Sequence, residues 1–212
     1  MNLTFHGIEP RERPLENGEA DVWVSRERFE SLLDAVAGRD DVRITFDDGN
    51  ASDLEVVLPA LRRRGLTGTF FVVADRLGAP GFLDAAGVRE LATAGMTIGS
   101  HGMRHRPWRQ LDDASLHEEL VEARAVLERI VGRPVAQAAC PFGAYDRRVL
   151  RALRRGGYSH VYTSDRGTAA AASWIQARNT VRWEDDAELL RQILGSKVML
   201  RRRVKLAAKR WR

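Results

Sequence analysis

Two groups of ionisable residues in the sequence have the types and the spacing to bind a divalent metal. The pair Asp47-Asp48 is followed by Gly49, and His101 precedes His105 by four residues. Adjacent carboxylates disfavour each other's ionisation unless a positive charge lies beside them, and a metal ion would supply it. One Asp and two His form a facial ligand set with open positions, which suits Zn²⁺ or a similar ion that binds water. The second Asp could then accept a proton from that water.

Each group alone is more typical of a solvated turn or of a surface histidine pair than of a site. Here both groups come at the ends of predicted strands, which favours a metal site. Because successive strand residues point to opposite sides, the two carboxylates need a turn to meet, and Gly49 permits one. His101 and His105 could face the same way if their segment takes a helical turn.

The elements that must position these residues alternate along the chain. Short β-branched or aromatic runs predict strands, and longer amphipathic segments predict helices. The expected strands span residues 3–8, 42–48, 67–73, 96–100, 135–141, 160–164 and 174–181, and the expected helices span 25–38, 52–65, 84–94, 112–131, 147–155 and 186–194. Such alternation predicts an α/β fold with a parallel sheet, and about seven repeats suit a barrel with its chemistry at the C-terminal strand ends.

Two predicted helices have recognisable boundaries. Ser25 is the candidate N-cap of the first helix, and Gly38 is the candidate residue just past its end. Ser52 is the candidate N-cap of the second helix. Pro59 inside that second helix should kink or divide it, because proline has no N–H to donate.

The composition describes a globular domain with an unusual C-terminal end. Of the 212 residues, 44% are hydrophobic and 30% are charged, and there is one cysteine, which fits a reducing compartment. Neither a signal peptide nor an apolar run long enough to span a bilayer is visible, so we expect a cytoplasmic protein. Residues 1–195 should form the catalytic domain. Residues 196–212 form a basic tail that could be helical.

The tail accounts for the positive net charge of the chain. Residues 197–212 carry eight basic residues and no acidic one, whereas the whole chain has a net charge of +5. Apolar residues lie among the bases, so the tail could rest on an anionic membrane surface, which would place the protein peripherally at the inner membrane face. A solvated basic end is the simpler interpretation. Nucleic-acid binding has no other supporting motif.

Three segments together resemble a known family. Residues 45–49 (TFDDG) resemble the first motif of the polysaccharide deacetylases, also called the NodB homology domain or carbohydrate esterase family 4. Residues 100–105 (SHGMRH) resemble its second motif, and residues 141–143 (PFG) resemble the core of its third. The resemblance extends over about residues 40 to 165.

The resemblance implies a distorted (β/α) barrel that removes an acetyl group, usually N-linked and sometimes O-linked, from a sugar. Carried over by position, Asp47 is the catalytic base. The metal ligands are Asp48, His101 and His105, and the ion is Zn²⁺ or another divalent ion such as Co²⁺. The substrate would be an acetylated sugar, a polysaccharide or a lipid-linked glycan.

The sequence departs from the family at two positions that handle protons. The third motif normally carries an arginine two residues before its proline, and Ala139 stands there. The fifth motif normally supplies a histidine as general acid, and no histidine follows His160. Arg178 on the last predicted strand is the candidate replacement for the arginine. His6, at the end of the first strand, is the candidate acid.

Other residues near the predicted strand ends could contact substrate. A backbone N–H near Phe142 or Gly143 could stabilise the oxyanion, and Pro141 belongs to the same motif. Trp108 and Tyr145 could stack against a sugar ring or pack in the core. The remaining polar candidates are expected to be structural or at the surface: His117, His160 and the buried thiol of Cys140.

Two alternatives stay open. The missing arginine and histidine could mark a catalytically impaired family member that binds glycans or acts as a scaffold. The chain could also be an esterase that removes O-acetyl groups from sugars. Acetate release from a panel of substrates would separate these alternatives.

Overall fold

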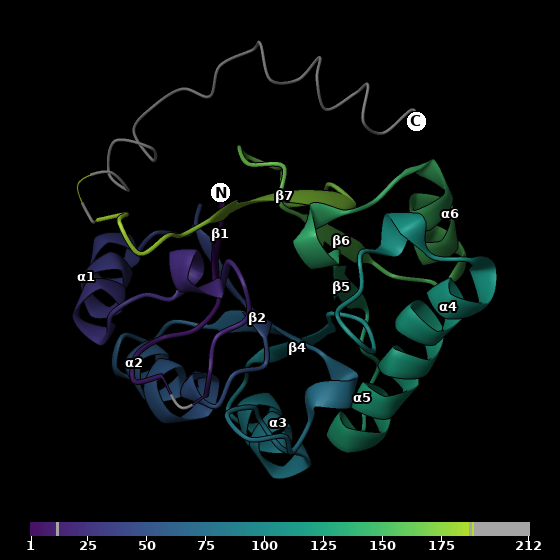
Figure 1. The fold of residues 1–212 in the computed structure, drawn as a ribbon. Coiled ribbons are helices and arrows are strands. Elements are labelled where there is room, and N and C mark those ends of the chain that lie inside the picture. The colour runs from purple at the N-terminus through teal and green to yellow at the C-terminus, as the bar shows by residue number, and fades with distance from the viewer. Residues whose placement is uncertain (12, 187, 189–212) are drawn as a thin grey trace.

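Seven parallel strands close into a barrel in the computed structural model, which describes residues 1–11, 13–186 and 188 (Figure 1). Each strand pairs with the next in sequence, and β1 also pairs with β7. The strands are β1 (Asn2–Phe5), β2 (Arg43–Asp48), β3 (Gly68–Val72), β4 (Thr97–Ser100), β5 (Gln137–Ala139), β6 (His160–Thr163) and β7 (Ile175–Thr180). This architecture confirms the predicted (β/α) barrel.

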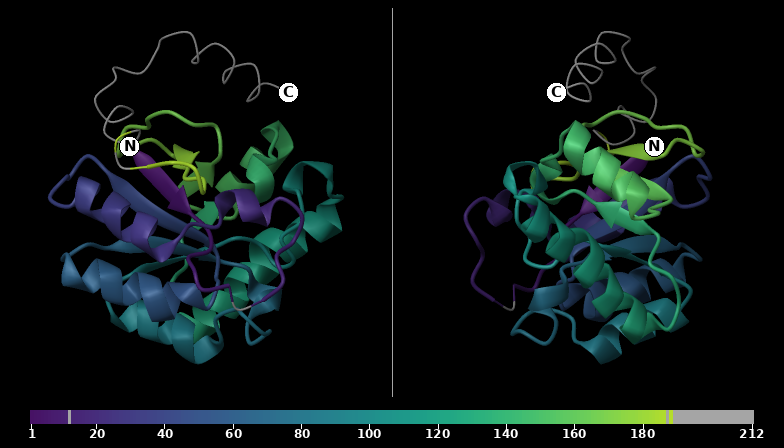
Figure 2. Two further views of the ribbon diagram at one scale, coloured as in Figure 1. Left: turned by 60° about the vertical axis from the view of Figure 1, so that its left-hand side comes forward. Right: turned by 90° about the vertical axis from the view of Figure 1, so that its right-hand side faces the viewer.

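Helices cover the outer side of the strands (Figures 1 and 2). The α-helices are α1 (Arg26–Val36), α2 (Leu58–Arg63), α3 (Ala85–Thr93), α4 (Asp113–His117), α5 (Ala123–Val131) and α6 (Arg147–Arg155). Short 3-10 turns are η1 (Glu19–Val22), η3 (Ala74–Arg76), η4 (Trp108–Gln110) and η6 (Pro141–Gly143), and π-helical turns are η2 (Asp53–Val57) and η5 (Glu118–Glu122). Residues 164–174 connect β6 to β7 without a helix, so the regular β/α alternation is interrupted there.

The helix boundaries agree with the sequence, but Ser52 stands at the N-cap position of its helix without a side-chain capping bond. The Ser25 hydroxyl accepts a hydrogen bond from the Arg28 N–H, as an N-cap should. The Ser52 hydroxyl instead accepts from the N–H of Ile8 at 3.3 Å. Ser52 therefore ties its helix to the segment after β1, and the prediction of a side-chain N-cap there is wrong.

The expected division of the second helix occurs just before its proline. Residues Asp53–Val57 form the π-helical turn η2, and α2 begins at Leu58 with Pro59 in its first turn. Proline donates no hydrogen bond and its ring crowds the carbonyl four residues earlier, so the regular α-helical ladder cannot run through it. The expected helix over residues 112–131 is likewise divided, by the π-helical turn η5.

Strand alternation separates an aromatic layer from a polar interior. Phe46 stacks between Phe5 and Phe70, with ring centroids 5.7 and 4.7 Å apart, and this layer packs against Phe29 of α1. The neighbouring strand position, Thr45, is buried on the other side, where its hydroxyl lies 2.9 Å from that of Thr4. Asp47 follows by the same alternation and so points into the barrel.

Two predictions from the sequence concern residues that lie mostly or wholly outside the described part of the chain. The helix expected over 186–194 lies, except for Asp186 and Glu188, outside the described residues, and the basic tail of residues 196–212 lies wholly outside them. Within the described part, no helix has the length and the apolar composition needed to cross a bilayer.

Candidate metal and catalytic site

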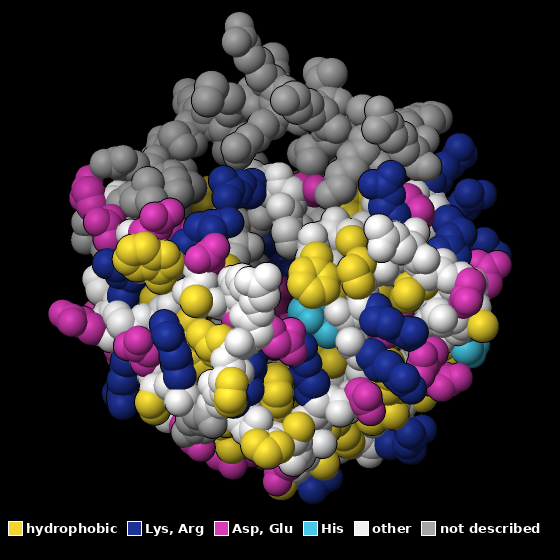
Figure 3. Space-filling view, viewed as in Figure 1, with side chains coloured by type: hydrophobic (Ala, Val, Ile, Leu, Met, Phe, Trp, Pro, Cys, Tyr) yellow, Lys and Arg dark blue, Asp and Glu magenta, His cyan; other side chains and the backbone are white. Residues whose placement is uncertain are grey.

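Three potential metal ligands converge at the C-terminal edge of the barrel. Ligand atoms of Asp48, His101 and His105 all lie within 4.8 Å of one another. Asp48 ends β2, and the two histidines follow β4. Figure 3 shows this face of the barrel, with histidine (cyan) at the surface beside a central hollow. The convergence predicted from the sequence is therefore present.

The turn that brings both carboxylates to the site begins at Asp48 itself. Asp48 has a φ of 79° and Gly49 a φ of 72°, both in the left-handed region. An aspartate in this conformation is uncommon, and such strain gathers at functional sites. Without the turn, strand alternation would direct Asp48 away from Asp47. His105 is also left-handed, with a φ of 55°.

The donors fit a divalent cation. Asp48 Oδ1 is buried and accepts no hydrogen bond from the described residues, while His105 Nε2 lies 3.3 Å and His101 Nε2 3.8 Å from it. A buried carboxylate oxygen without a partner is costly, and a cation held there would satisfy it. One oxygen and two imidazole nitrogens are a ligand set that suits Zn²⁺.

His101 is oriented for ligation by the backbone of β5. Its Nδ1 lies 2.9 Å from the carbonyl oxygen of Ala139, so the Nδ1–H donates there and Nε2 faces the site. Metal-binding histidines commonly fix their tautomer this way. Burial lowers the pKa of His101 to about 4, so the ring is neutral at pH 7, as a ligand must be.

Asp47 is held by Arg178. Arg178 Nη1 donates to Asp47 Oδ1 at 2.6 Å and Nη2 donates to Oδ2 at 2.7 Å, with both side chains almost completely buried. Burial alone would raise the pKa of Asp47, but the charge of Arg178 outweighs burial and holds that pKa well below its ordinary value. Asp47 is therefore ionised, and the sequence-predicted contact with Arg178 is present.

His6 lies next to Asp47, just past the end of β1. Its Nε2 is 3.9 Å from Asp47 Oδ2, and its side chain is 21% exposed. Its Nδ1 is buried and has no hydrogen-bond partner among the described residues. His6 thus borders the site, as predicted, and its role as an acid stays a prediction.

The third-motif segment borders the site through one exposed ring. Phe142 is 67% exposed, and its ring centroid lies 4.5 Å from that of His105. Pro141 and Gly143 are buried, and the Gly143 N–H already donates to the Cys140 carbonyl at 2.9 Å. Of the two backbone N–H groups proposed for the oxyanion, only that of Phe142 therefore stays a candidate.

The proposed stacking of Trp108 and Tyr145 on a sugar is wrong. Trp108 is 0% and Tyr145 1% exposed, so neither ring presents a face to substrate. Trp108 donates its indole N–H to Glu119, and the Tyr145 hydroxyl donates to Asp165. Both aromatic residues pack in the core, which was the other interpretation of the sequence. As expected, His117 is exposed and Cys140 is a buried free thiol.

Sequence reasoning missed Glu119, which holds the loop between the two histidines. Glu119 is 0% exposed and accepts hydrogen bonds from the backbone N–H groups of Met103 and Arg104, at 2.8 and 3.1 Å. It also accepts from the Arg106 and Trp108 side chains. Its carboxylate approaches Gly102 so closely that a Cβ there would lie 2.2 Å from Oε2. A signal existed, because Glu119 stands beside Leu116 and Leu120 on the apolar face of its helix.

Replacing Glu119 with glutamine should loosen this loop. The neutral amide cannot accept all these bonds, so we expect a loss of about 2 kcal/mol in the free energy of unfolding and roughly 10- to 100-fold weaker metal binding. Denaturant unfolding and metal titration measure the two effects. Glu118→Gln is the matched control, because Glu118 pairs with Arg104 and Arg106, whose side chains are 57% and 32% exposed, and less than about 1 kcal/mol should be lost there. Equal effects in both variants would contradict the assignment.

Arg76 is a second residue that the motifs did not reveal. Its Nη1 lies 3.7 Å from Asp48 Oδ1, and its Nη2 pairs with Glu16 at 2.7 Å. Asp53 is a third, since both of its buried carboxylate oxygens lack a partner among the described residues. Burial raises the pKa of Asp53 well above its ordinary value, and the charges of Asp48 and Asp47 add to the shift.

Comparisons with known proteins place this chain in one class. The family model described as polysaccharide deacetylase matches residues 35–161. YxkH of Bacillus subtilis (strain 168), named as a polysaccharide deacetylase, is 26% identical over 141 residues, covering 66% of this chain and 50% of the relative. The peptidoglycan-N-acetylglucosamine deacetylase of Bacillus cereus is 27% identical over 124 residues, covering 58% of this chain and 56% of the relative.

A solved structure shares the fold over nearly the whole chain. The Streptococcus pyogenes deacetylase PplD, in complex with acetate, superposes with a TM-score of 0.79 at 20% identity, covering 92% of this chain and 97% of that chain. The chain belongs to the polysaccharide deacetylase family. It spans about half the length of the curated relatives it matches.

Proposed function

We propose that this protein is a metal-dependent hydrolase that removes an acetyl group, most simply an N-acetyl group, from a sugar or polysaccharide. One observation carries the proposal: the ionised Asp47, clamped by Arg178, stands beside three potential metal ligands. A free carboxylate next to a cation site is the arrangement that metal-assisted hydrolysis requires. Family membership supplies the acetylated sugar as substrate class.

In this mechanism Asp48, His101 and His105 would hold the cation and Asp47 would be the base. A bound divalent cation would polarise the acetyl carbonyl and lower the pKa of a water molecule to near neutrality. Asp47 needs that help, because the guanidinium of Arg178 makes it a weak base. Each Asp47 oxygen keeps a second lone pair beside its bond from Arg178, so it can still accept a proton.

Arg178 and His6 would take over the proton-handling roles that the family motifs leave unfilled here. Arg178, on β7, donates hydrogen bonds to Asp47. Ala139 on β5, at the position of the family arginine, has only a methyl side chain and cannot donate one. His6 could protonate the leaving nitrogen, since its imidazole Nε2 lies 3.9 Å from the same carboxylate, just past the end of β1. The N–H of Phe142 would face the developing oxyanion. Zn²⁺ suits this ligand set, and Co²⁺ shares it.

Chelation tests the proposal. The wild-type protein should release acetate from at least one N-acetylated glycan, lose this activity in a chelator, and regain it on addition of Zn²⁺ or Co²⁺. At an ion concentration 100 times its Kd, binding should stabilise the fold by about 2.7 kcal/mol. For a domain of this size that corresponds to a rise of roughly 5–10 °C in Tm. Both acetate release and thermal unfolding should be measured with and without the ion.

Asp48→Asn is the matched variant, because it removes the ligand charge while keeping the side-chain shape. Its Tm should not respond to added ion. A wild-type protein that binds Zn²⁺ yet releases no acetate from amides or esters would contradict the proposal and favour a binding role. Release only from O-acetylated sugars would identify an esterase. The cytoplasmic location and the membrane contact of the basic tail stay predictions from the sequence.

A further inference from the structure

A cavity of about 390 Å³ lies between the last turns of α3 and α5. Its lining includes Arg89 of α3, Arg129 of α5 and Arg133, which lies two residues past α5. Because α3 leads into the first residue of β4 while His101 follows the last, this cavity and the candidate metal site lie at opposite ends of that strand. Cavities of this size typically hold small ligands.

The cavity between α3 and α5 is lined by positive charge alone. The guanidinium groups of Arg89, Arg129 and Arg133 are the charged groups among its lining residues, and no carboxylate lines it. All three arginines are exposed, and none of them makes an ion pair with a carboxylate in the part of the chain that the structure describes. Like charges around one space repel one another, so this arrangement favours a bound anion.

The helix ends offset part of this positive charge. Arg133 Nη2 donates to the carbonyl oxygens of Ala92, at 3.4 Å, and Met96, at 3.0 Å, where α3 ends. The C-terminus of a helix is equivalent to roughly half a negative charge, so α3 and α5 together offset about one of the three positive charges. A surplus of roughly two positive charges remains. A phosphate monoester carries about the same negative charge at neutral pH.

Arg133 is already positioned for such a ligand. Its bonds to the two carbonyl oxygens come from Nη2 and hold the guanidinium, while its Nη1 and Nε donate to no other residue that the structure describes. The planar fork of N–H groups on a guanidinium matches the spacing of phosphate oxygens. Ile130 and Val131 also line the cavity and pack against the main hydrophobic core, so they offer a firm apolar surface to the organic part of a phosphate ester.

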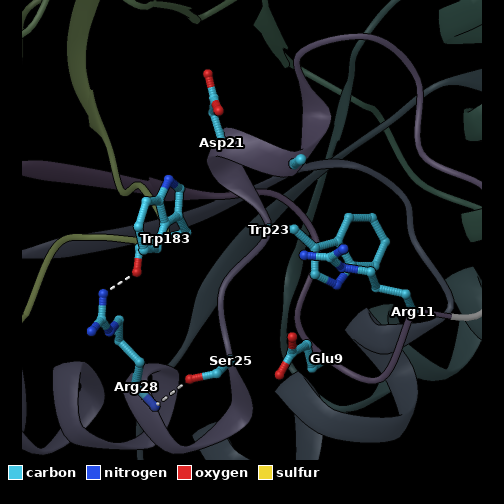
Figure 4. A pocket seen from close by; sticks show the side chains of 8 residues that line it. Glu9, Arg11, Asp21, Trp23, Ser25, Arg28 and Trp183 are labelled. Carbon is cyan, nitrogen blue, oxygen red and sulfur yellow. Dashed lines mark hydrogen bonds between the residues drawn. The ribbon is translucent and has the colours of Figure 1, made fainter.

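A cavity of similar size between the loop after β1 and the segment after β7 has a different charge pattern (Figure 4). It measures about 430 Å³, and its lining combines Glu9 and Asp21 with Arg11 and Arg28, so the formal charges cancel. Arg28 also donates a hydrogen bond to the carbonyl oxygen of Trp183, as the dashed line in Figure 4 shows. The two carboxylates would repel a phosphate there, so this cavity offers a control.

We propose that the cavity between α3 and α5 binds the phosphate group of a phosphate monoester. Arg133 holds the phosphate from the end of α3, and Arg89 and Arg129 donate to it from the two helices. The ligand class is defined by its phosphate, which a small soluble ester and the headgroup of a phospholipid both carry. The site lies away from Asp47 and the metal ligands, so this inference does not rest on the proposed function.

The first test titrates the full chain, kept in a chelator, with glycerol 3-phosphate in a calorimeter. The double variant Arg89→Gln/Arg129→Gln should bind at least about tenfold more weakly than the wild type, because two of three charge-assisted contacts are lost. Its Tm without ligand should equal that of the wild type, because neither side chain bonds to another residue that the structure describes. Arg11→Gln/Arg62→Gln is the matched control, since it removes two exposed arginines elsewhere, and it should bind as the wild type does.

The second test identifies the source of the phosphate. The same proteins are floated with phosphatidylcholine vesicles that contain or lack phosphatidic acid, a lipid whose headgroup is a phosphate monoester. Weaker binding by Arg89→Gln/Arg129→Gln than by its control in the titration identifies a soluble ester, and a loss confined to the vesicles identifies a lipid. No binding in either test, or equal binding by the two double variants in both, would overturn the proposal. Acetate release enters neither measurement, so the proposed function stands or fails separately.

Discussion

Replacing Asp47 with asparagine is expected to lower kcat for acetate release by about two to four orders of magnitude, the usual contribution of a general base. The amide has nearly the shape of the carboxylate but cannot accept the proton. Metal content should be unchanged, because both oxygens of Asp47 accept hydrogen bonds from Arg178, whereas Asp48 is grouped with the histidines. Acetate assays and metal analysis on the same preparation measure both quantities.

Asp48→Asn separates the two aspartates. It should lose most of the bound metal together with activity, while Asp47→Asn loses activity alone. If Asp47→Asn also lost its metal, Asp47 would be a ligand and the base would have to be sought elsewhere. If it kept its turnover, the acid-base assignment would be wrong. Either result can be interpreted without a change in packing, because neither substitution changes the volume of a buried side chain appreciably.

The barrel could be predicted because its signals are local and repeated. Strand runs such as residues 42–48 and 67–73 end within one residue of the observed β2 and β3. The position of Pro59 indicated where its helix would change. The left-handed conformation of Asp48 was harder to predict from the sequence. Gly49 indicated a turn, but the strained backbone conformation belongs to Asp48, the residue before it.

The site residues that belong to the sequence motifs could be predicted. The residues that hold those side chains or loops in place, and that lie elsewhere in the sequence, could not. The metal ligands lie in two short motifs. Glu119 belongs to no motif, and it lies in the π-helical turn η5, from which its carboxylate accepts hydrogen bonds from the loop between the histidines. Trp108 and Tyr145 were misjudged for a related reason. Proximity to a motif in sequence says nothing about whether an aromatic ring faces solvent or the core.

Replacing Arg178 with methionine is expected to destabilise the fold by about 3–5 kcal/mol and to remove activity. Arg178 is 1% exposed and Asp47 3%, so losing the guanidinium leaves a carboxylate buried beside His6 and His101 without its main counter-charge. The pKa of Asp47 should rise, because burial then acts without the opposing charge of Arg178. Denaturant unfolding measures the loss of stability.

The double variant Asp47→Asn/Arg178→Met distinguishes this cause from simple loss of packing. With both charges gone, much of the lost stability should return, because the penalty of a single variant is mainly that of the charge left alone. Arg178→Lys should be intermediate, since lysine keeps the charge but cannot form the two parallel hydrogen bonds. If the double variant were less stable than Arg178→Met by the full effect of Asp47→Asn, the two residues would be energetically independent. The clamp would then be a packing contact and could not set the basicity of Asp47.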